Sequence, residues 1–278
     1  MKRHKSAFTL IELLVVIAII GLLLAIIVPA LKRAKEKAQF LLCQFNLKAY
    51  GLTVKVYLND NDNTYPDCYT SMFNSEKAFS DGIPYNCQWH DRRISPNNTS
   101  RYAGPLWPYM DSDAAHMCPT FKTFAKAYGE DHTGHDFNIP IEPQYAYSQN
   151  AFLGGLKSDG TPWAILKESE VTSPAETLVW VEETIWKIPG WADYELNDTC
   201  FFSRHDDDVC NFGDFIATYH NTPIDRRDNG LGNAVFVDGH IQLNDPYDSV
   251  ELQGGKVARR SFILAWPLKG KLSPTMLY

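Results

Sequence analysis

The amino-terminal part of the chain carries its clearest hydrophobic pattern. From Phe8 to Leu31 the only strongly polar side chains are those of Thr9 and Glu12, and Leu13–Val28 has none. As a helix that rises about 1.5 Å per residue, this stretch extends roughly 36 Å, which is enough to cross the hydrocarbon core of a bilayer. The pattern therefore predicts a membrane-spanning helix.

The pattern becomes amphipathic after Pro29. Apolar residues recur at spacings of three and four, the period of a helix, while charged residues occupy the other faces. We expect one helix from Phe8 to about Leu58, its first half in lipid and its second half packed through this apolar face on a globular domain. Gly51 weakens the expectation for the last two turns. The apolar face comprises Leu31, Ala34, Ala38, Leu41, Phe45, Ala49, Leu52 and Val56.

The remainder of the chain predicts a sheet with long loops. A cluster of turn-forming residues, Asn59–Pro66, ends the helix. Residues 67–145 are rich in Pro, Gly, Asn and Asp, and we expect loops there, with short elements around Gly104–Met110 and Thr120–Ala127. Three runs have strand character, and an Asp238-Gly239 turn joins the last two in a hairpin. These antiparallel runs are Glu176–Glu183, Asn233–Asp238 and His240–Leu243. The fold class predicted is α+β, a long helix packed on an antiparallel sheet.

Composition and charge exclude several classes of protein. The 278 residues are 45% apolar and 13% aromatic, which is enough to fill a core and argues against disorder. The net charge of −7 argues against a nucleic-acid-binding surface, which needs a basic face. No Gly-x-Ser-x-Gly, phosphate-binding Gly-rich loop or His-Glu-x-x-His motif is present, so we expect no enzymatic activity.

The flanking charges predict the orientation of the membrane segment. The basic run Lys2–Lys5 precedes it, which favours a cytoplasmic amino terminus and an exported remainder. One interpretation is an uncleaved single-pass anchor. A second is a signal peptide cut after Ala30, although the apolar run is longer than the usual core of about 7–15 residues.

A third interpretation explains Glu12, since a carboxylate within an apolar membrane helix normally needs a partner. The residues Ala7-Phe8-Thr9-Leu10-Ile11-Glu12-Leu13 resemble the processing site of type IV prepilins and type II secretion pseudopilins. This resemblance implies cleavage after Ala7 by a prepilin peptidase and N-methylation of Phe8. It also implies that Glu12 pairs with the Phe8 ammonium of a neighbouring subunit. Ala7 departs from the family pattern, in which Gly usually precedes the cut.

The same resemblance implies a pilin-like fold and a structural role in a filament. Gly21 and Pro29 lie where such helices loosen during assembly. The partners implied are the prepilin peptidase, other pseudopilin subunits, an inner-membrane assembly platform and the lipid bilayer. The filament would belong to a type II secretion system or a type IV pilus. The expected parts are a cytoplasmic leader (1–7), a transmembrane assembly helix (8–31), its amphipathic continuation (32–58) and a periplasmic α+β domain (59–278).

A narrower resemblance extends over most of the chain. Its motifs are similar to those of a subgroup of pseudopilin-like proteins abundant in planctomycetes, which ends in a His, a spacer and Asp-Gly-His. Here an insertion, Thr222–Asp228, lengthens the spacer between His220 and Asp238. The other matching segments are Cys43–Lys48, Tyr57, Asp62–Pro66, Leu106–Tyr109, Cys118-Pro119, Tyr147–Asn150 and Ser173–Thr177.

The aromatic residues leave a different function open. Trp89, Trp107, Trp163, Trp186 and Trp191 would form an exposed platform in a membrane-anchored module that binds glycan or an exported substrate and does not polymerise. The alternative is that these side chains pack the long loops over the sheet.

Candidate metal ligands are few and weak. His220, Asp238 and His240 are one candidate set. Asp206, Asp207 and Asp208 form an acidic loop, and the calcium site that major pseudopilins have in a late loop suggests Ca²⁺ there by resemblance. His132 and His135, in the sequence His-Thr-Gly-His, are too sparse for a zinc site without a cysteine pair.

Six cysteines in an exported domain indicate disulfides, with fifteen full pairings open. Cys200 with Cys210, which closes a short loop, is the first candidate pair. Cys68 with Cys87 is the second, and Cys43 is expected to be a buried thiol on the helix.

Overall fold

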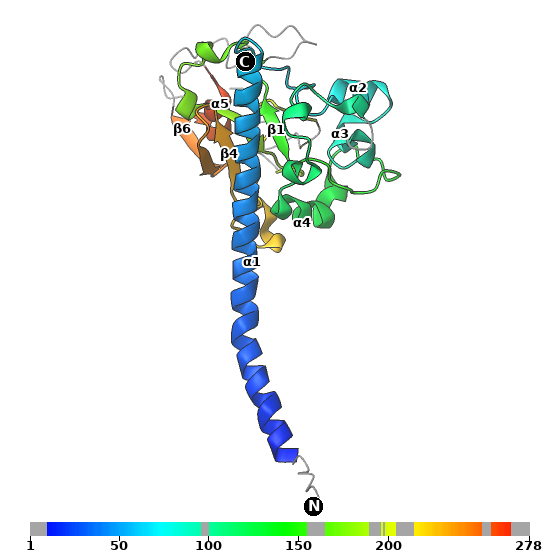
Figure 1. Cartoon of the computed structure of the whole chain (residues 1–278), viewed down its shortest axis with the longest axis vertical. Coiled ribbons are helices and arrows are strands. Elements are labelled where there is room, and N and C mark those ends of the chain that lie inside the picture. Colours follow the sequence, from blue (N-terminus) through cyan, green and yellow to red (C-terminus); the bar gives the residue numbers. More distant parts are fainter. Residues whose placement is uncertain are drawn as a thin grey trace, which may run out of the picture.

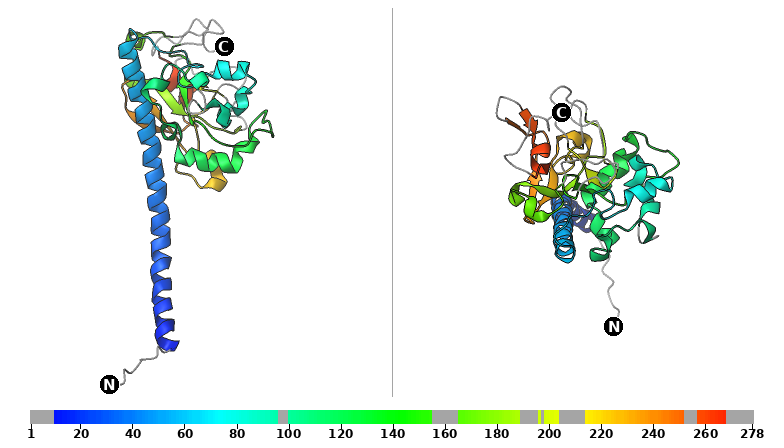
Figure 2. Two further views of the ribbon diagram at one scale, coloured as in Figure 1. Left: turned by 45° about the vertical axis from the view of Figure 1, so that its right-hand side comes forward. Right: turned by 90° about the horizontal axis from the view of Figure 1, so that it is seen from above.

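The computed structural model describes residues 10–95, 100–154, 165–188, 196, 198–203, 214–251 and 257–267. Helix α1 (Leu10–Asp60) is 51 residues long, and its amino-terminal half projects away from a globular part (Figure 1). Residues 10–38 are all exposed, whereas the carboxyl-terminal half lies along the globular part (Figure 2). The predicted continuous helix is confirmed over the described residues, which exclude Phe8.

Five strands form the central sheet, in the spatial order β3-β1-β2-β4-β5. All neighbours are antiparallel except β1 and β3, which are parallel. The three predicted strands are confirmed as β2, β4 and β5, and Gly239, at φ +88°, makes the tight turn between the last two. The strands are β1 (Tyr147–Asn150), β2 (Leu178–Glu182), β3 (Cys200–Phe201), β4 (Gly232–Phe236) and β5 (Ile241–Asn244).

Short helices and a small ribbon complete the globular part. Helix α4 (Pro119–Tyr128) and the 3₁₀ helix η3 (Trp107–Tyr109) confirm the two short elements expected within residues 67–145. The α-helices are α2 (Ser75–Ser80), α3 (Tyr85–Gln88), α4 (Pro119–Tyr128) and α5 (Arg260–Ala265), and the ribbon pairs β6 (Ser249–Glu251) with β7 (Val257–Arg259). The 3₁₀ helices are η1 (Arg92–Ile94), η2 (Ser100–Tyr102), η3 (Trp107–Tyr109), η4 (Asp113–His116), η5 (Gly129–Asp131), η6 (Glu168–Glu170), η7 (Pro174–Glu176) and η8 (Ile224–Asn229).

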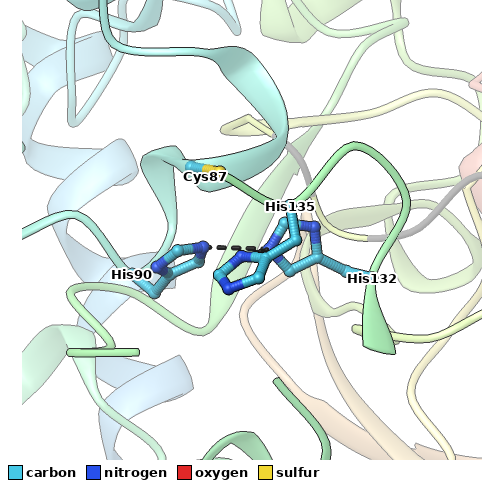
Figure 3. Close-up of side chains that lie close together, drawn as sticks. All are labelled: Cys87, His90, His132 and His135. Atoms are coloured by element: carbon cyan, nitrogen blue, oxygen red, sulfur yellow. Dashed lines mark hydrogen bonds between the residues drawn. The ribbon is translucent and has the colours of Figure 1, made fainter. Parts of the chain in front are cut away.

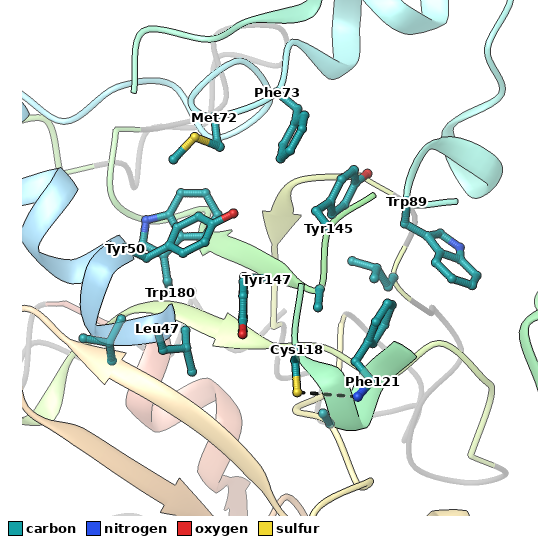
Figure 4. Close-up of a cluster of buried hydrophobic side chains, with 14 of the residues drawn as sticks. Leu47, Tyr50, Met72, Phe73, Trp89, Cys118, Phe121, Tyr145, Tyr147 and Trp180 are labelled. Carbon is teal, nitrogen blue, oxygen red and sulfur yellow. Dashed lines mark hydrogen bonds between the residues drawn. The ribbon is translucent and has the colours of Figure 1, made fainter. Parts of the chain in front are cut away.

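The core lies on both faces of the sheet. On one face Trp180 packs against Tyr50 of α1, with ring centroids 4.5 Å apart (Figure 4). On the other face Val181 and Phe236 belong to a cluster with Leu264 and Trp266 at the end of the described chain. Because β2 and β4 are buried on both faces, their sequences do not alternate between apolar and polar residues. The α+β fold, a long helix on a mostly antiparallel sheet, is confirmed.

Candidate functional site

The exposed half of α1 is the first candidate functional element. It is long and apolar enough to cross a membrane, and none of its most apolar stretch is buried inside the protein. Glu12 lies in the first turn of the described helix, and Gly21 and Pro29 lie within its helical span. One apolar surface therefore surrounds the helix from Leu10 to Leu31, as expected of a segment that is covered by lipid or by other helices.

The face of α1 that contacts the domain differs from the sequence prediction. The predicted contact residues Leu41, Phe45, Leu52 and Val56 are instead exposed, by 50% or more. At about 100° per residue these four side chains lie within a 60° arc on one side of the helix, and we call them the α1 stripe. The prediction was wrong because the helix has two apolar faces, and the other one packs on the sheet. That buried face consists of Cys43, Asn46, Leu47, Tyr50, Gly51, Thr53, Val54 and Leu58.

Gly51 brings the buried face of α1 close to the sheet. A Cβ at this position would lie 2.7 Å from Cγ2 of Val235 on β4, which is shorter than van der Waals contact allows. The absence of a side chain lets the helix backbone approach the strand directly. Gly51 is thus a packing residue within an unbroken helix.

Two disulfides correct the predicted pairings. Cys43 on α1 pairs with Cys118, 75 positions away, and Cys68 pairs with Cys200, 132 positions away. Cys43 is therefore not a thiol, and neither Cys68–Cys87 nor Cys200–Cys210 forms. The short loops that suggested those pairs do not decide the outcome, because folding brings distant cysteines together, with Cα atoms 4.7 and 5.1 Å apart. The first disulfide fastens α1 to the start of α4.

A buried polar network lies beside the Cys43–Cys118 disulfide. His220 Nε2 is 2.9 Å from the Glu182 carboxylate, and both side chains are almost fully buried. Glu182 also accepts hydrogen bonds from the backbone N–H and side-chain amide of Asn233, at 2.8 and 3.0 Å. The network joins β2 to β4 beneath the helix. Glu182 gave no signal in the sequence, since it ends an otherwise apolar strand.

The proposed grouping of His220 with Asp238 and His240 is wrong for the described structure. Asp238 Oδ1 is 2.6 Å from His240 Nδ1 at the surface, where the pair flanks the hairpin turn. His220 is buried with Glu182 instead, and neither Asp238 nor His240 joins a group of converging metal-ligating side chains in the described part of the chain. The Asp-Gly-His motif thus forms a turn.

The tryptophan platform is also contradicted where it can be examined. Trp89, Trp107 and Trp186 are all buried, with at most 9% of their surface exposed. They pack the loops over the sheet, as the alternative interpretation expected. Trp163 and Trp191 lie outside the described residues.

The structure corrects the interpretation of the His-Thr-Gly-His segment. His132 and His135 lie together with Cys87 and His90, and one potential ligand atom from each of the four residues lies within 4.8 Å of all the others (Figure 3). Burial lowers the pKa of His90 and His132 to about 4 and raises the pKa of the Cys87 thiol. Sequence reasoning missed this cluster because it sought a cysteine pair. The signal available was a Cys-x-x-His and a His-x-x-His pair in one loop-rich region.

Several predicted site residues lie outside the described structure. These are the processing residues Ala7 and Phe8, the acidic residues Asp206, Asp207 and Asp208, and Cys210. Their roles remain predictions.

Comparisons with known proteins identify the amino-terminal segment. Residues 2–28 match the family model for the prokaryotic N-terminal methylation motif. The chain carries a prepilin-type motif. It is also distantly similar to the type II secretion system core protein G of Pseudomonas aeruginosa, with 35% identity over 60 residues, which cover 22% of this chain and 42% of that protein.

A second core protein G, from Aeromonas hydrophila, is 42% identical over 65 residues, covering 23% of this chain and 45% of that protein. The chain thus spans less than half the length of these curated relatives. No solved structure matches the chain.

Proposed function

We propose that the chain is a structural, pseudopilin-like subunit of a type II secretion system or a related type IV pilus-like filament. The methylation motif at residues 2–28 and the similarity to core protein G support this assignment. The observation that carries it is the α1 stripe, an apolar surface that a plain membrane anchor does not require.

The stripe continues the apolar surface of the membrane segment alongside the globular domain. It lies on the side of α1 opposite the buried residues Leu47, Tyr50 and Val54. Each large apolar side chain that leaves water contributes about 1.5–3 kcal/mol, so its four members together favour association. An extended apolar stripe on a helix fits another long helix, and the partner we propose is α1 of a second copy of this chain.

Processing would prepare the amino terminus for this association. Prepilin peptidase would cut after Ala7 on the cytoplasmic side and methylate Phe8. In the filament the Glu12 carboxylate would pair with the Phe8 ammonium of the adjacent subunit, which would set the axial register and neutralise both charges in an apolar bundle. Gly21 and Pro29 would allow the helix to loosen locally.

The expected parts of the chain follow from this proposal. Residues 1–7 are the leader, 8–31 the transmembrane assembly helix, 32–58 its continuation and 59–278 the periplasmic domain. Removal of the leader leaves 271 residues with a formal charge of −10, since Lys2, Arg3 and Lys5 are lost from a chain of charge −7. Processed subunits would be anchored in the inner membrane and would join the filament at an assembly platform.

A Glu12→Ala variant tests the assembly role. We expect normal membrane insertion and at least a tenfold loss of pelletable filaments, measured by shearing, ultracentrifugation and electron microscopy. Glu36→Ala is the matched control, because Glu36 is an exposed carboxylate further along α1. Filament yield equal to that of the control would contradict the role of Glu12.

A second variant separates a filament subunit from an anchored, non-polymerising binding module. Phe45→Ser removes the most exposed side chain of the α1 stripe, at 70% exposure, without touching the core. We expect fewer cross-linked dimers in membranes and an unchanged free energy of unfolding. Identical cross-linking in Phe45→Ser and in Lys35→Ser, a control at an exposed charged position of the same helix, would favour the module.

A further inference from the structure

Four metal-ligating side chains converge in the loop-rich region beside the sheet. Cys87 belongs to α3 and His90 follows it, whereas His132 and His135 lie in the turn after η5. The two pairs come from segments 42 positions apart in the sequence. Figure 3 shows the three imidazole rings close together beside the Cys87 sulfur.

One nitrogen of His132 lies within hydrogen-bond distance of two other imidazole nitrogens, and it cannot form a good hydrogen bond with both. His132 Nε2 lies 2.9 Å from His90 Nε2 and 3.0 Å from His135 Nδ1. An imidazole nitrogen has a single in-plane position, which holds either a proton or a lone pair. It therefore cannot form good hydrogen bonds in two directions, but three lone pairs can point at one cation.

Hydrogen bonds at Nδ1 of His90 and of His132 fix the tautomer that metal binding through Nε2 requires. His90 Nδ1 is 3.1 Å from the carbonyl oxygen of Pro140, and His132 Nδ1 is 3.2 Å from the carbonyl oxygen of Thr133. A carbonyl only accepts, so each Nδ1 carries the proton and each Nε2 presents its lone pair. Two facing lone pairs 2.9 Å apart repel each other unless a cation lies between them. Carbonyl acceptors on the outer nitrogen are also typical of metal-bound histidines.

Cys87 supplies the fourth potential ligand. It is fully buried, and it is the one described cysteine that is not in a disulfide. Its Sγ accepts a hydrogen bond from the backbone N–H of Asp136 at 3.4 Å. This N–H stabilises the negative sulfur of a thiolate, the form in which cysteine binds metal.

The backbone around the cluster is built to hold this arrangement. Gly134 adopts a left-handed conformation, at φ +70°, which turns the chain so that His132 and His135 reach the same point. The Asn86 side chain donates a hydrogen bond of 2.8 Å to the carbonyl of Thr133, which ties α3 to this turn. A Cβ at position 134 would lie 2.6 Å from the same Asn86 amide nitrogen.

We propose that Cys87, His90, His132 and His135 form a structural zinc site. Zinc bonds of about 2.0–2.3 Å in tetrahedral geometry place ligand atoms about 3.3–3.8 Å apart, and the four atoms here lie within 4.8 Å of one another. One sulfur and three nitrogens suit Zn²⁺, and four protein ligands leave no position for substrate.

The ion would stabilise a region with little regular structure. The described part of residues 67–145 has short helices and no strand of the sheet, and scattered backbone hydrogen bonds, such as that from the Gln144 N–H to the Trp89 carbonyl, join its segments. A metal that binds the folded chain and not the unfolded one adds its binding free energy to stability. The site thus joins the α3 segment to the loop after η5, where the two disulfides do not reach.

The test uses the full chain in detergent, stripped with a chelator and titrated with Zn²⁺ or Co²⁺. We expect one Zn²⁺ per chain by elemental analysis. Co²⁺ should give the intense visible bands of tetrahedral coordination together with a thiolate-to-cobalt charge-transfer band. Less than a tenth of an equivalent of zinc, or cobalt spectra without a thiolate band, would overturn the proposal. Retention of copper in place of added zinc would overturn the assignment to zinc.

Variants locate the site. Cys87→Ser should abolish the charge-transfer band and lower zinc affinity at least 100-fold, whereas His240→Gln, which changes an exposed histidine, should bind like the wild type. Wild-type affinity in both Cys87→Ser and His132→Ala would overturn the proposal.

The alkylation rate of the Cys87 thiol tests the site in a chain that keeps all four proposed ligands, so a folding defect in the ligand variants does not affect it. In a Cys210→Ser background, zinc should slow alkylation of Cys87 at least tenfold relative to the chelated protein. Equal rates would refute thiolate ligation.

Discussion

The disulfide between Cys43 and Cys118 should contribute about 4 kcal/mol to the stability of the globular domain. The perturbation is the double variant Cys43→Ala/Cys118→Ser, which leaves no unpaired thiol from this pair. Cys118 is the N-cap residue of α4, where its sulfur accepts a hydrogen bond from the backbone N–H of Phe121. We choose serine at position 118 because serine is also a good N-cap residue.

The magnitude follows from the length of chain that the bond closes. For residues 75 positions apart, the loss of loop-closure entropy in the unfolded chain corresponds to about 4.5 kcal/mol at 25 °C. The Cys68–Cys200 bond overlaps this loop and already restricts the unfolded chain. That overlap shortens the effective loop and reduces the expected value slightly, to about 4 kcal/mol.

The assay is urea denaturation of the detergent-solubilised full chain, followed by tryptophan fluorescence. Trp180 is a suitable reporter because it packs on Tyr50, which lies about two turns from Cys43 on the same buried face of α1. Leu42→Ala, at an exposed neighbouring position, serves as the control and should change the free energy of unfolding by less than about 0.5 kcal/mol. A loss below about 1 kcal/mol in the double variant, with an unchanged denaturant slope, would contradict the proposed contribution of this disulfide.

Three further predictions concern packing, pH and metal affinity. Gly51→Leu should destabilise the domain by about 1–3 kcal/mol because it forces α1 away from Val235, and an unchanged urea midpoint would contradict this contact. Burial lowers the pKa of His116 to about 4, below the ordinary value of about 6.5. The unfolded chain therefore binds a proton first as the pH falls, and stability should decrease between pH 6.5 and 4, by up to about 3 kcal/mol from this residue. Urea midpoints across this range should fall less in His116→Gln, and parallel curves would refute the assignment. Asn86→Ala should weaken zinc binding about 10–100-fold in competition with a chelator, because Asn86 holds the turn between His132 and His135, and equal affinity would contradict this positioning role.

The long helix was predictable from sequence, but its orientation on the domain was not. An unbroken apolar run and a helical period are local properties, and they located α1 to within two residues at its carboxyl end. The buried face is no more hydrophobic than the exposed one, since it includes Asn46 and Thr53 whereas the α1 stripe is wholly apolar. Which face meets the domain depends on contacts such as that between Gly51 and Val235, which sequence periodicity does not encode.

Strand β1 could not be predicted from the sequence for a different reason. Its sequence, Tyr-Ser-Gln-Asn, has no hydrophobic pattern, yet all four residues are buried. Gln149 donates to the carbonyls of Pro66 and Leu153, and Asn150 donates to those of Leu178 and Ala265. These hydrogen bonds compensate for the burial of polar groups, and the three that reach Pro66, Leu178 and Ala265 exist only once the fold has formed.

The disulfides and the histidine cluster show why residues that meet in the fold could not be paired from the sequence. Loop length favoured Cys200–Cys210 and Cys68–Cys87, whereas the folded chain joins cysteines 75 and 132 positions apart. The zinc ligands likewise come in two short pairs whose approach depends on the turn at Gly134 and on its contact with Asn86. Each pair is too common to predict a site, and only their convergence makes one.

The most direct test of the proposed function is the mass of the mature chain. Protein extracted from membranes would be measured intact and as amino-terminal peptides. We expect a chain that begins at N-methylated Phe8, lighter by residues 1–7 and heavier by one methyl group. A chain that retains Met1, or one that begins at Leu31, would contradict processing by the prepilin pathway.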